Sequence, residues 1–127
     1  MLTLEDINKI KDPAERRKLK EELVEADEAA DRKEANDDFL SFVKQMWPQF
    51  IEGEHHKRIS DKFNKLASGE ITRLIINMPP RHTKSEFASY FLPAWMIGKN
   101  PALKIIQATH TAELAISFGR KTKNLID

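Results

Sequence analysis

The sequence predicts an α/β fold, in which parallel β-strands with flanking helices follow a mostly helical N-terminal region. Two short apolar segments, residues 71–77 and 103–108, have the β-branched composition of strands, and the apolar stretch between them has the length and spacing of a helix. Strands that are joined through a helix favour parallel pairing with a right-handed crossover. Because only two such strands occur, we expect an incomplete sheet, the front part of a larger domain.

The bulk properties are those of one small globular domain. The chain has 127 residues, of which 40% are hydrophobic and 32% charged, and it contains no cysteine, which excludes disulfides and thiolate metal sites. No apolar run approaches the roughly 20 residues that cross a bilayer, and the start of the chain lacks the features of a signal peptide. We therefore expect no membrane partner and a cytoplasmic location.

Charge divides the chain into two parts. Residues 1–38 carry 13 acidic and 8 basic side chains, a net charge of −5, whereas residues 39–127 carry 7 acidic and 13 basic ones, a net charge of +6. The basic part suits phosphate, either as free nucleotide or as nucleic acid, although solvated surface is an equal alternative. We predict a charged helical extension over 1–38 and a second domain over 39–127.

The N-terminal extension is expected to be helical over residues 3–35. Asp12 followed by Pro13 is a helix start signal, with aspartate as N-cap and proline at the first helical position. Its apolar stripe is thin, formed by Leu19, Leu23 and Ala26. A stripe of this width buries little surface, so the helix is expected to be exposed or to dock on a partner.

Two amphipathic helices are expected to begin the second domain. The first starts after Asp38, its expected cap, is dense in Phe and other apolar residues, and stops at Pro48. The second covers residues 54–68, and Gly69 supplies its C-terminal cap. We expect Trp47 and Trp95 to be core anchors.

Two further helices are expected towards the C-terminus. One covers residues 84–97 and ends at Gly98, and Pro93 within it should kink it or remove a hydrogen bond. The last is capped by Thr109 or Thr111 and carries Phe118 on its apolar side.

Residues 71–86 carry the most specific signal. An apolar strand leads into a turn at Pro79 and Pro80, and Lys84-Ser85 then opens a helix, the order in which P-loop proteins hold nucleotide phosphates. That pattern asks for Gly-x-x-x-x-Gly-Lys-Ser/Thr, and here Met78 and Thr83 stand at the glycine positions. The prediction of an incomplete P-loop NTPase therefore depends on this context. The plain alternative is a strand–turn–helix connection with solvated cations.

The loop side chains suit a triphosphate with Mg²⁺. Lys84 would reach phosphate oxygens as a point charge, and the Ser85 hydroxyl would ligate Mg²⁺, which prefers oxygen. The planar fork of Arg81 suits a γ-phosphate, and His82 would help to shape the loop. Without glycine the loop must wrap using Thr83 and Met78. The two prolines stiffen the turn, whereas any residue at positive φ would cost roughly 1 kcal/mol or more.

Residues 69–86, Gly-Glu-Ile-Thr-Arg-Leu-Ile-Ile-Asn-Met-Pro-Pro-Arg-His-Thr-Lys-Ser-Glu, resemble the Walker A region of the large terminase subunit of tailed bacteriophages and prophages. One branch of that family has Pro-Pro-Arg-His-x-Lys-Ser after a Gly-Glu-x-x-Arg-Leu strand. The resemblance reaches upstream to Trp47-Pro48 and Glu54-His55-His56, and downstream to residues 108–115. It covers about residues 39–127.

This resemblance implies the ATP-binding part of a motor that packages double-stranded DNA into procapsids. It implies ATP and Mg²⁺ as cofactors, the small terminase subunit and the portal protein as partners, a homo-oligomeric ring, and the cytoplasm of an infected or lysogenic bacterial cell. Arg81 and Lys84 match catalytic positions, and Ser85 matches the Mg²⁺ ligand. His55 or His56 lies near the adenine-contacting segment. The ATP-binding residues so implied are Pro79, Pro80, Arg81, His82, Thr83, Lys84 and Ser85.

The chain departs from the family in its acidic residues. No strand ends in the acidic Walker B pair, and the carboxylates of the nuclease domain are absent. The chain is thus expected to be a fragment, a piece of a split gene or a prophage remnant. Two alternatives remain open: a helicase-like nucleic-acid translocase with the same front end, and a non-catalytic interaction protein with a vestigial P-loop.

Overall fold

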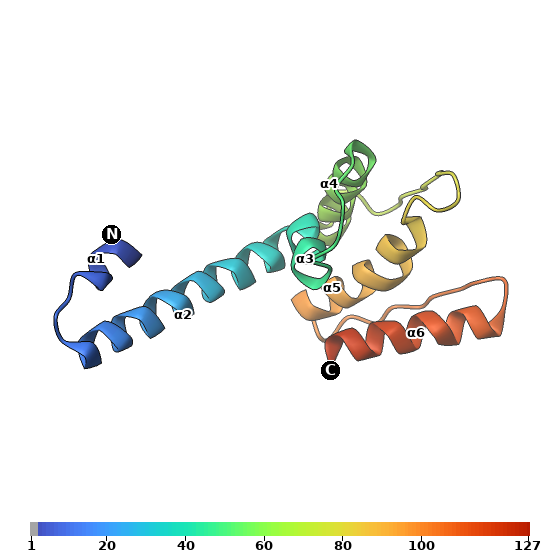
Figure 1. Ribbon diagram of the computed structural model, residues 1–127. Helices are drawn as coiled ribbons and strands as arrows, with labels where there is room; N and C mark the ends of the chain where they lie inside the picture. Colours follow the sequence, from blue (N-terminus) through green and yellow to red (C-terminus); the bar gives the residue numbers. More distant parts are fainter. Residues whose placement is uncertain (1–2) are drawn as a thin grey trace. The chain divides into compact units, whose positions relative to one another are not determined.

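A computed structural model describes residues 3–127, which are helical or irregular and contain no β-strand (Figure 1). The chain forms two compact units, the first ending at Glu34 and the second covering Ala35–Asp127. The elements in chain order are α1 (Leu4–Asn8), α2 (Pro13–Asp37), α3 (Phe39–Met46), α4 (Glu54–Ser68), the π-helical segment η1 (Glu86–Phe91), α5 (Leu92–Lys99) and α6 (Ala112–Ile126).

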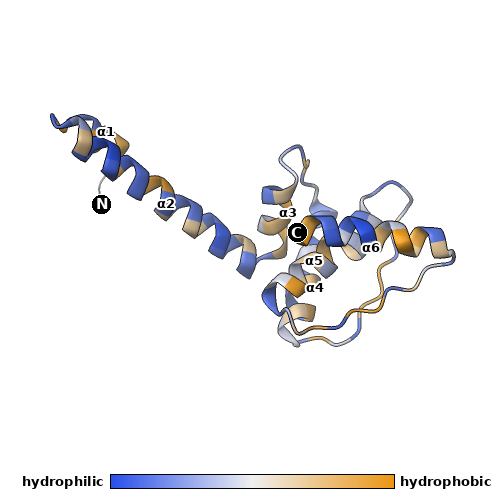
Figure 2. Ribbon diagram, turned by 90° about the horizontal axis from the view of Figure 1, so that it is seen from below, coloured by the Kyte–Doolittle hydropathy of each residue, from blue (hydrophilic) through white to orange (hydrophobic). Residues whose placement is uncertain are grey.

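The predicted α/β fold is wrong. Residues 71–77 and 103–108 form no β-ladder within the part of the chain that the structure describes, and the P-loop sheet expected from them is missing. Leu74 and Ile76 pack partly against the core, whereas Ile75 and Ile106 are left open, 87% and 95% exposed. Figure 2 shows both stretches as hydrophobic chain outside the helices. A strand needs a partner along its whole length, and composition alone does not supply one.

The first unit is held together by local hydrogen bonds. Thr3 and Asp6 cap α1 reciprocally, and Asp12 caps α2 by accepting from the Ala14 N–H at 3.0 Å. The Arg16 guanidinium donates to the Ile10 carbonyl at 2.6 Å. From there α2 is almost wholly hydrophilic (Figure 2), as its thin stripe predicted.

The second unit has an aromatic core with Phe39 at its centre. The Phe39 ring meets the rings of Phe63, Phe87 and Trp95 edge-on, at centroid distances of 5.0, 5.4 and 5.5 Å. These rings come from α3, α4, η1 and α5, so one residue ties four elements together. The Trp95 indole donates to the Ala35 carbonyl at 2.9 Å, which satisfies its polar end inside the core. The prediction that Trp95 anchors the core is confirmed.

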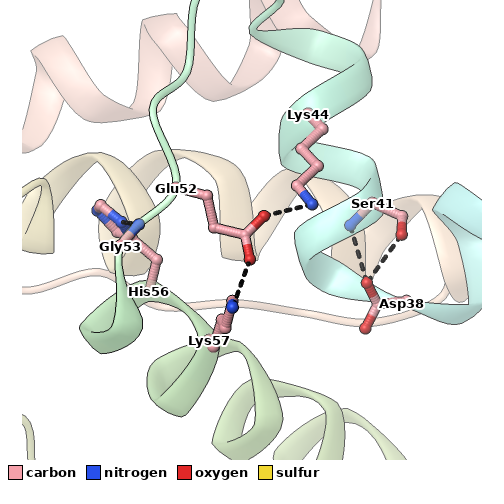
Figure 3. Close-up of polar contacts among 7 residues, drawn as sticks. All are labelled: Asp38, Ser41, Lys44, Glu52, Gly53, His56 and Lys57. Carbon is pink, nitrogen blue, oxygen red and sulfur yellow. Dashed lines mark hydrogen bonds and ion pairs between the residues drawn. The ribbon is translucent and has the colours of Figure 1, made fainter.

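Polar contacts join α3 to α4 at the edge of this core (Figure 3). Asp38 caps α3, as predicted, by accepting from Ser41. Asn64 of α4, which Figure 3 does not draw, donates to the same carboxylate at 2.7 Å. Burial opposes the charge, but the bonds from Asn64 and Ser41 prevail and hold the pKa of Asp38 below its ordinary value. Glu52 links Lys44 of α3 with Lys57 of α4.

The helix that follows the predicted loop runs over residues 84–99 and contains the π turns of η1. Pro93 has no N–H for the carbonyl of Ser89 four residues earlier, and the Gln107 side chain donates to that carbonyl at 2.7 Å. The last helix, α6, is capped by Thr111, one of the two residues predicted, and packs against η1 and α5.

Candidate functional site

The loop between residue 78 and the helix at Lys84 has an unusual backbone. Arg81 has φ 64° and Thr83 has φ 60°, so two non-glycine residues, separated only by residue 82, adopt the left-handed conformation. For an L-residue this costs roughly 1–2 kcal/mol, and more for a β-branched side chain such as that of Thr83. Strain of this kind is found at ligand-binding sites, where the surrounding structure imposes it.

A cavity of about 300 Å³ opens on this loop. Its lining comes from Pro79, Arg81, Thr83, Lys84, Ser85 and Glu86. The structure thus places five of the seven predicted ATP-binding residues in the lining of one cavity. Pro80 and His82 do not line it; both are exposed, and the His82 ring donates from Nδ1 to the Pro80 carbonyl at 3.0 Å.

Lys84 lies across the loop. Its Nζ is 3.5 Å from the carbonyl oxygen of Met78, the residue at the first glycine position of the P-loop pattern. The ammonium therefore points back toward the turn and not into solvent. A bond of this length is weak, so little is lost when the ammonium turns to an anion in the cavity.

Arg81 and Ser85 are the exposed polar residues of the cavity lining. Among residues 3–127 the Arg81 guanidinium makes no ion pair with an acidic side chain, which leaves its donors available. The Ser85 hydroxyl supplies an oxygen of the kind that Mg²⁺ prefers. Together with Lys84 they give the lining two cations and a hydroxyl.

Glu86 is the acid of the cavity, and sequence reasoning missed it. Its carboxylate lies 3.4 Å from Nζ of Lys121 on α6, which offsets part of its charge. A carboxylate beside a hydroxyl and an incoming phosphate is an oxygen set suited to Mg²⁺, which usually keeps several waters and takes one or two carboxylates. Ser85 and Glu86 thus fit the expected ion in kind.

His56 on α4 reaches the loop and bonds to Thr83. Its Nδ1 accepts from the Gly53 N–H at 2.8 Å (Figure 3), and its Nε2 lies 2.7 Å from Oγ1 of Thr83. Because a backbone N–H can only donate, the ring proton is on Nε2, which donates to Thr83. The Thr83 hydroxyl in turn donates to the His82 carbonyl at 2.6 Å. These three hydrogen bonds link the Gly53 N–H, both ring nitrogens of His56, the Thr83 hydroxyl and the His82 carbonyl in one continuous series.

The surroundings of His56 keep its ring neutral. The side chain is buried, and its ring lies 4.7 Å from that of Phe50 and 5.1 Å from that of Phe87, measured between centroids. Burial, followed by the nearby His55 and His82, lowers the pKa of His56 below its ordinary value of 6.5, against the opposite effect of Glu52. The neutral tautomer fits the hydrogen bonds described above.

A second cavity, of about 350 Å³, lies between α4 and residues 74–78. His55, Arg58 and Lys62 supply its charged rim, and Ile59, Leu74 and Ile76 supply apolar lining. His55 therefore lies beside this cavity, while His56 contacts the loop through Thr83. The adenine contact that the resemblance implies for one of them stays a prediction.

Comparison of the chain with protein-family models, curated proteins and solved structures gave no match. Within residues 3–127, no three His, Cys, Asp or Glu side chains form a group that could hold a metal ion. The helices in that range are also too short or too polar to cross a membrane.

The role of His56 had only a weak signal in the sequence. A glycine followed by a side-chain acceptor at the third helical position is one half of a capping box, and this pattern predicts the bond from Gly53. Nothing local predicts the contact with Thr83, which is 27 residues away.

Proposed function

We propose that the loop of residues 79–86 binds the phosphates of ATP with Mg²⁺, and that the chain is the ATP-binding part of a DNA-packaging motor. The observation that carries the phosphate site is the cavity at a loop with two left-handed residues, where Lys84, Arg81 and Ser85 converge. Backbone N–H groups in such loops form concavities that bind anions. This site does not depend on a β-sheet.

Each residue of the loop has a separate role in binding the phosphates and Mg²⁺. The Lys84 ammonium leaves the Met78 carbonyl for phosphate oxygens, and the Arg81 guanidinium binds the terminal phosphate from solvent. The Ser85 hydroxyl and the Glu86 carboxylate would hold Mg²⁺, which would supply neutralisation of the phosphate charge. Arg81 and Lys84 are placed to stabilise charge that develops during phosphoryl transfer.

The motor assignment is supported by the resemblance of residues 69–86 and by the net charge of +6 on residues 39–127. Double-stranded DNA is the partner that this charge suits. The small terminase subunit, the portal protein, a homo-oligomeric ring and the bacterial cytoplasm belong to the same proposal.

Titration calorimetry with Mg-ATP tests the site. We expect micromolar binding by the 127-residue chain and a loss of at least about tenfold in Lys84→Ala, since a charged contact contributes about 1.5–3 kcal/mol. Lys104→Ala is the matched control, because Lys104 is exposed in residues 103–108 and does not line the cavity. Equal affinity in wild type and Lys84→Ala, or no binding by wild type, would refute the site and favour a vestigial loop.

A further inference from the structure

We propose that His56 is a positioning residue for the phosphate loop: its hydrogen bond to Thr83 holds the backbone there in the left-handed conformation that shapes the cavity. This inference rests on the proposed function, and it assigns His56 to loop geometry and not to contact with the nucleotide. His56 does not line the cavity, whereas Thr83 does.

Thr83 is the residue that needs such support. It stands at the second glycine position of the P-loop pattern, has φ 60° and carries a β-branched side chain. Glycine takes this conformation without strain, and threonine does not. The Thr83 hydroxyl lies between the His56 ring at 2.7 Å and the His82 carbonyl at 2.6 Å, so it is bonded on both sides.

His56 is itself held rigidly enough to serve as the support. The Gly53 N–H fixes its Nδ1, and the rings of Phe50 and Phe87 enclose it, so that 6% of the residue is exposed. Phe87 also packs against Phe39 at the centre of the core. The bond to Thr83 therefore connects the loop to the best-packed part of the unit.

The arrangement makes the loop sensitive to pH. A second proton on His56 would place a hydrogen on Nδ1, where the Gly53 N–H already donates, and the ring would have to move. The titratable groups that face the ring are His55 beside it on α4, Glu52 just before α4 and His82 in the loop; Phe50 and Phe87 add none. The lowered pKa of His56 places this change below pH 6.5. A histidine that touched phosphate directly would strengthen binding on protonation, so the two roles predict opposite trends.

A double-mutant cycle on the full chain tests the proposal, with Mg-ATP as the probe. His56→Phe keeps an aromatic ring but removes the bond to Thr83, and we expect about tenfold weaker binding, the loss that one hydrogen bond produces. In a Thr83→Gly background the same substitution should cost less than about threefold, because glycine needs no support. Equal losses in both backgrounds would overturn the proposal. His110→Phe is the control, since His110 is exposed in the turn before α6.

The pH dependence gives a second readout. The affinity ratio of wild type to His56→Phe cancels the titration of the ligand itself, and it should fall toward one as the pH is lowered below 6.5. A ratio that rises would show that a protonated histidine binds phosphate and would overturn the positioning role.

A ligand-free measurement separates this inference from the proposed function. A residue at positive φ gives a strong intraresidue NOE between its HN and Hα protons, which we expect for Thr83 in wild type and not in His56→Phe. If wild type binds no Mg-ATP, the proposed function fails while the NOE still reports the support by His56. If the NOE persists in His56→Phe, the positioning role is wrong even where nucleotide binds.

Discussion

At the scale of single residues, the side chains of two histidines lie so close to Gly53 that they fill the space a Cβ atom would need. A Cβ atom there would lie 2.8 Å from Cε1 of His55 and 3.4 Å from Nδ1 of His56. The first distance is shorter than carbon atoms tolerate, so the His55 ring would have to move. The centroid of that ring lies 3.8 Å from the centroid of the His56 ring, with the planes tilted by 41°, and 5.7 Å from the centroid of the His82 ring, so the disturbance would spread to the loop.

We therefore expect Gly53→Ala to lower the free energy of unfolding by about 1 kcal/mol, a typical cost of overpacking. Gly98→Ala in α5 is the matched control, because a Cβ there meets nothing within 4 Å. In a helix that change should stabilise by about 0.5–1 kcal/mol. Urea denaturation followed by circular dichroism measures both; the same shift in both variants would contradict the crowding at Gly53.

The sequence predicted the residues that the loop itself contributes to the candidate site. Lys84, Ser85 and Arg81 are close along the chain, so their convergence on one cavity follows from local geometry. Of the two residues at the glycine positions, Met78 and Thr83, the structure gives only Thr83 a positive φ, and it adds Arg81. His56 and Lys121 come from other helices, and their approach to the loop depends on packing that no local pattern encodes.

At the scale of elements, the helix over residues 84–99 depends on a bond from outside itself. Gln107 donates to the Ser89 carbonyl, to which Pro93 cannot donate because proline has no N–H. The same bond holds the extended residues 103–108 against η1. A side chain in an irregular segment thus completes the hydrogen bonding of a helix.

Replacing Gln107 by Ala should cost about 1 kcal/mol, since it leaves a half-buried carbonyl without its donor. In a Pro93→Ala background the cost should be smaller, because residue 93 then offers an N–H of its own. Thermal denaturation of the four proteins of this cycle measures the coupling. Additive losses would show that Gln107 does not compensate for the proline.

The helices themselves were predictable from the sequence because their signals are local. Asp12, Asp38 and Thr111 cap three of them, and Gly69 ends α4 with φ 81°. The two strands were not, because a strand is defined by its neighbour. The segments around Ile75 and Ile106 have the composition of strands, but within the described residues they pair with no other strand.

At the scale of the whole molecule, the exposed apolar segments are the main liability. Residues 71–77 and 103–108 offer unpaired backbone groups together with Ile75 and Ile106, which are almost fully open. Unpaired extended chain of this kind recruits other chains. We expect the protein to self-associate as its concentration rises.

Ile75→Lys should reduce this self-association, because it removes an apolar side chain and adds charge at the open edge. Thr72→Lys is the matched control, since it adds the same charge at an exposed position of the same segment without removing apolar surface. Sedimentation velocity over a range of concentrations gives the result. Equal improvement in both variants would assign the effect to net charge alone.

The π turns of η1 also set the phase of the helix that carries Lys84. Each residue of a regular helix advances it by about 100°, and a π turn holds one residue more than an α turn. Lys84 and Ser85 therefore face a direction that a uniform helix with the same buried Phe91 and Trp95 would not give them. Loss of one residue from 86–91 would turn Lys84 and Ser85 by about 100° relative to Phe91 and Trp95, so the number of residues in this turn decides the direction of the ammonium as much as the identity of residue 84 does.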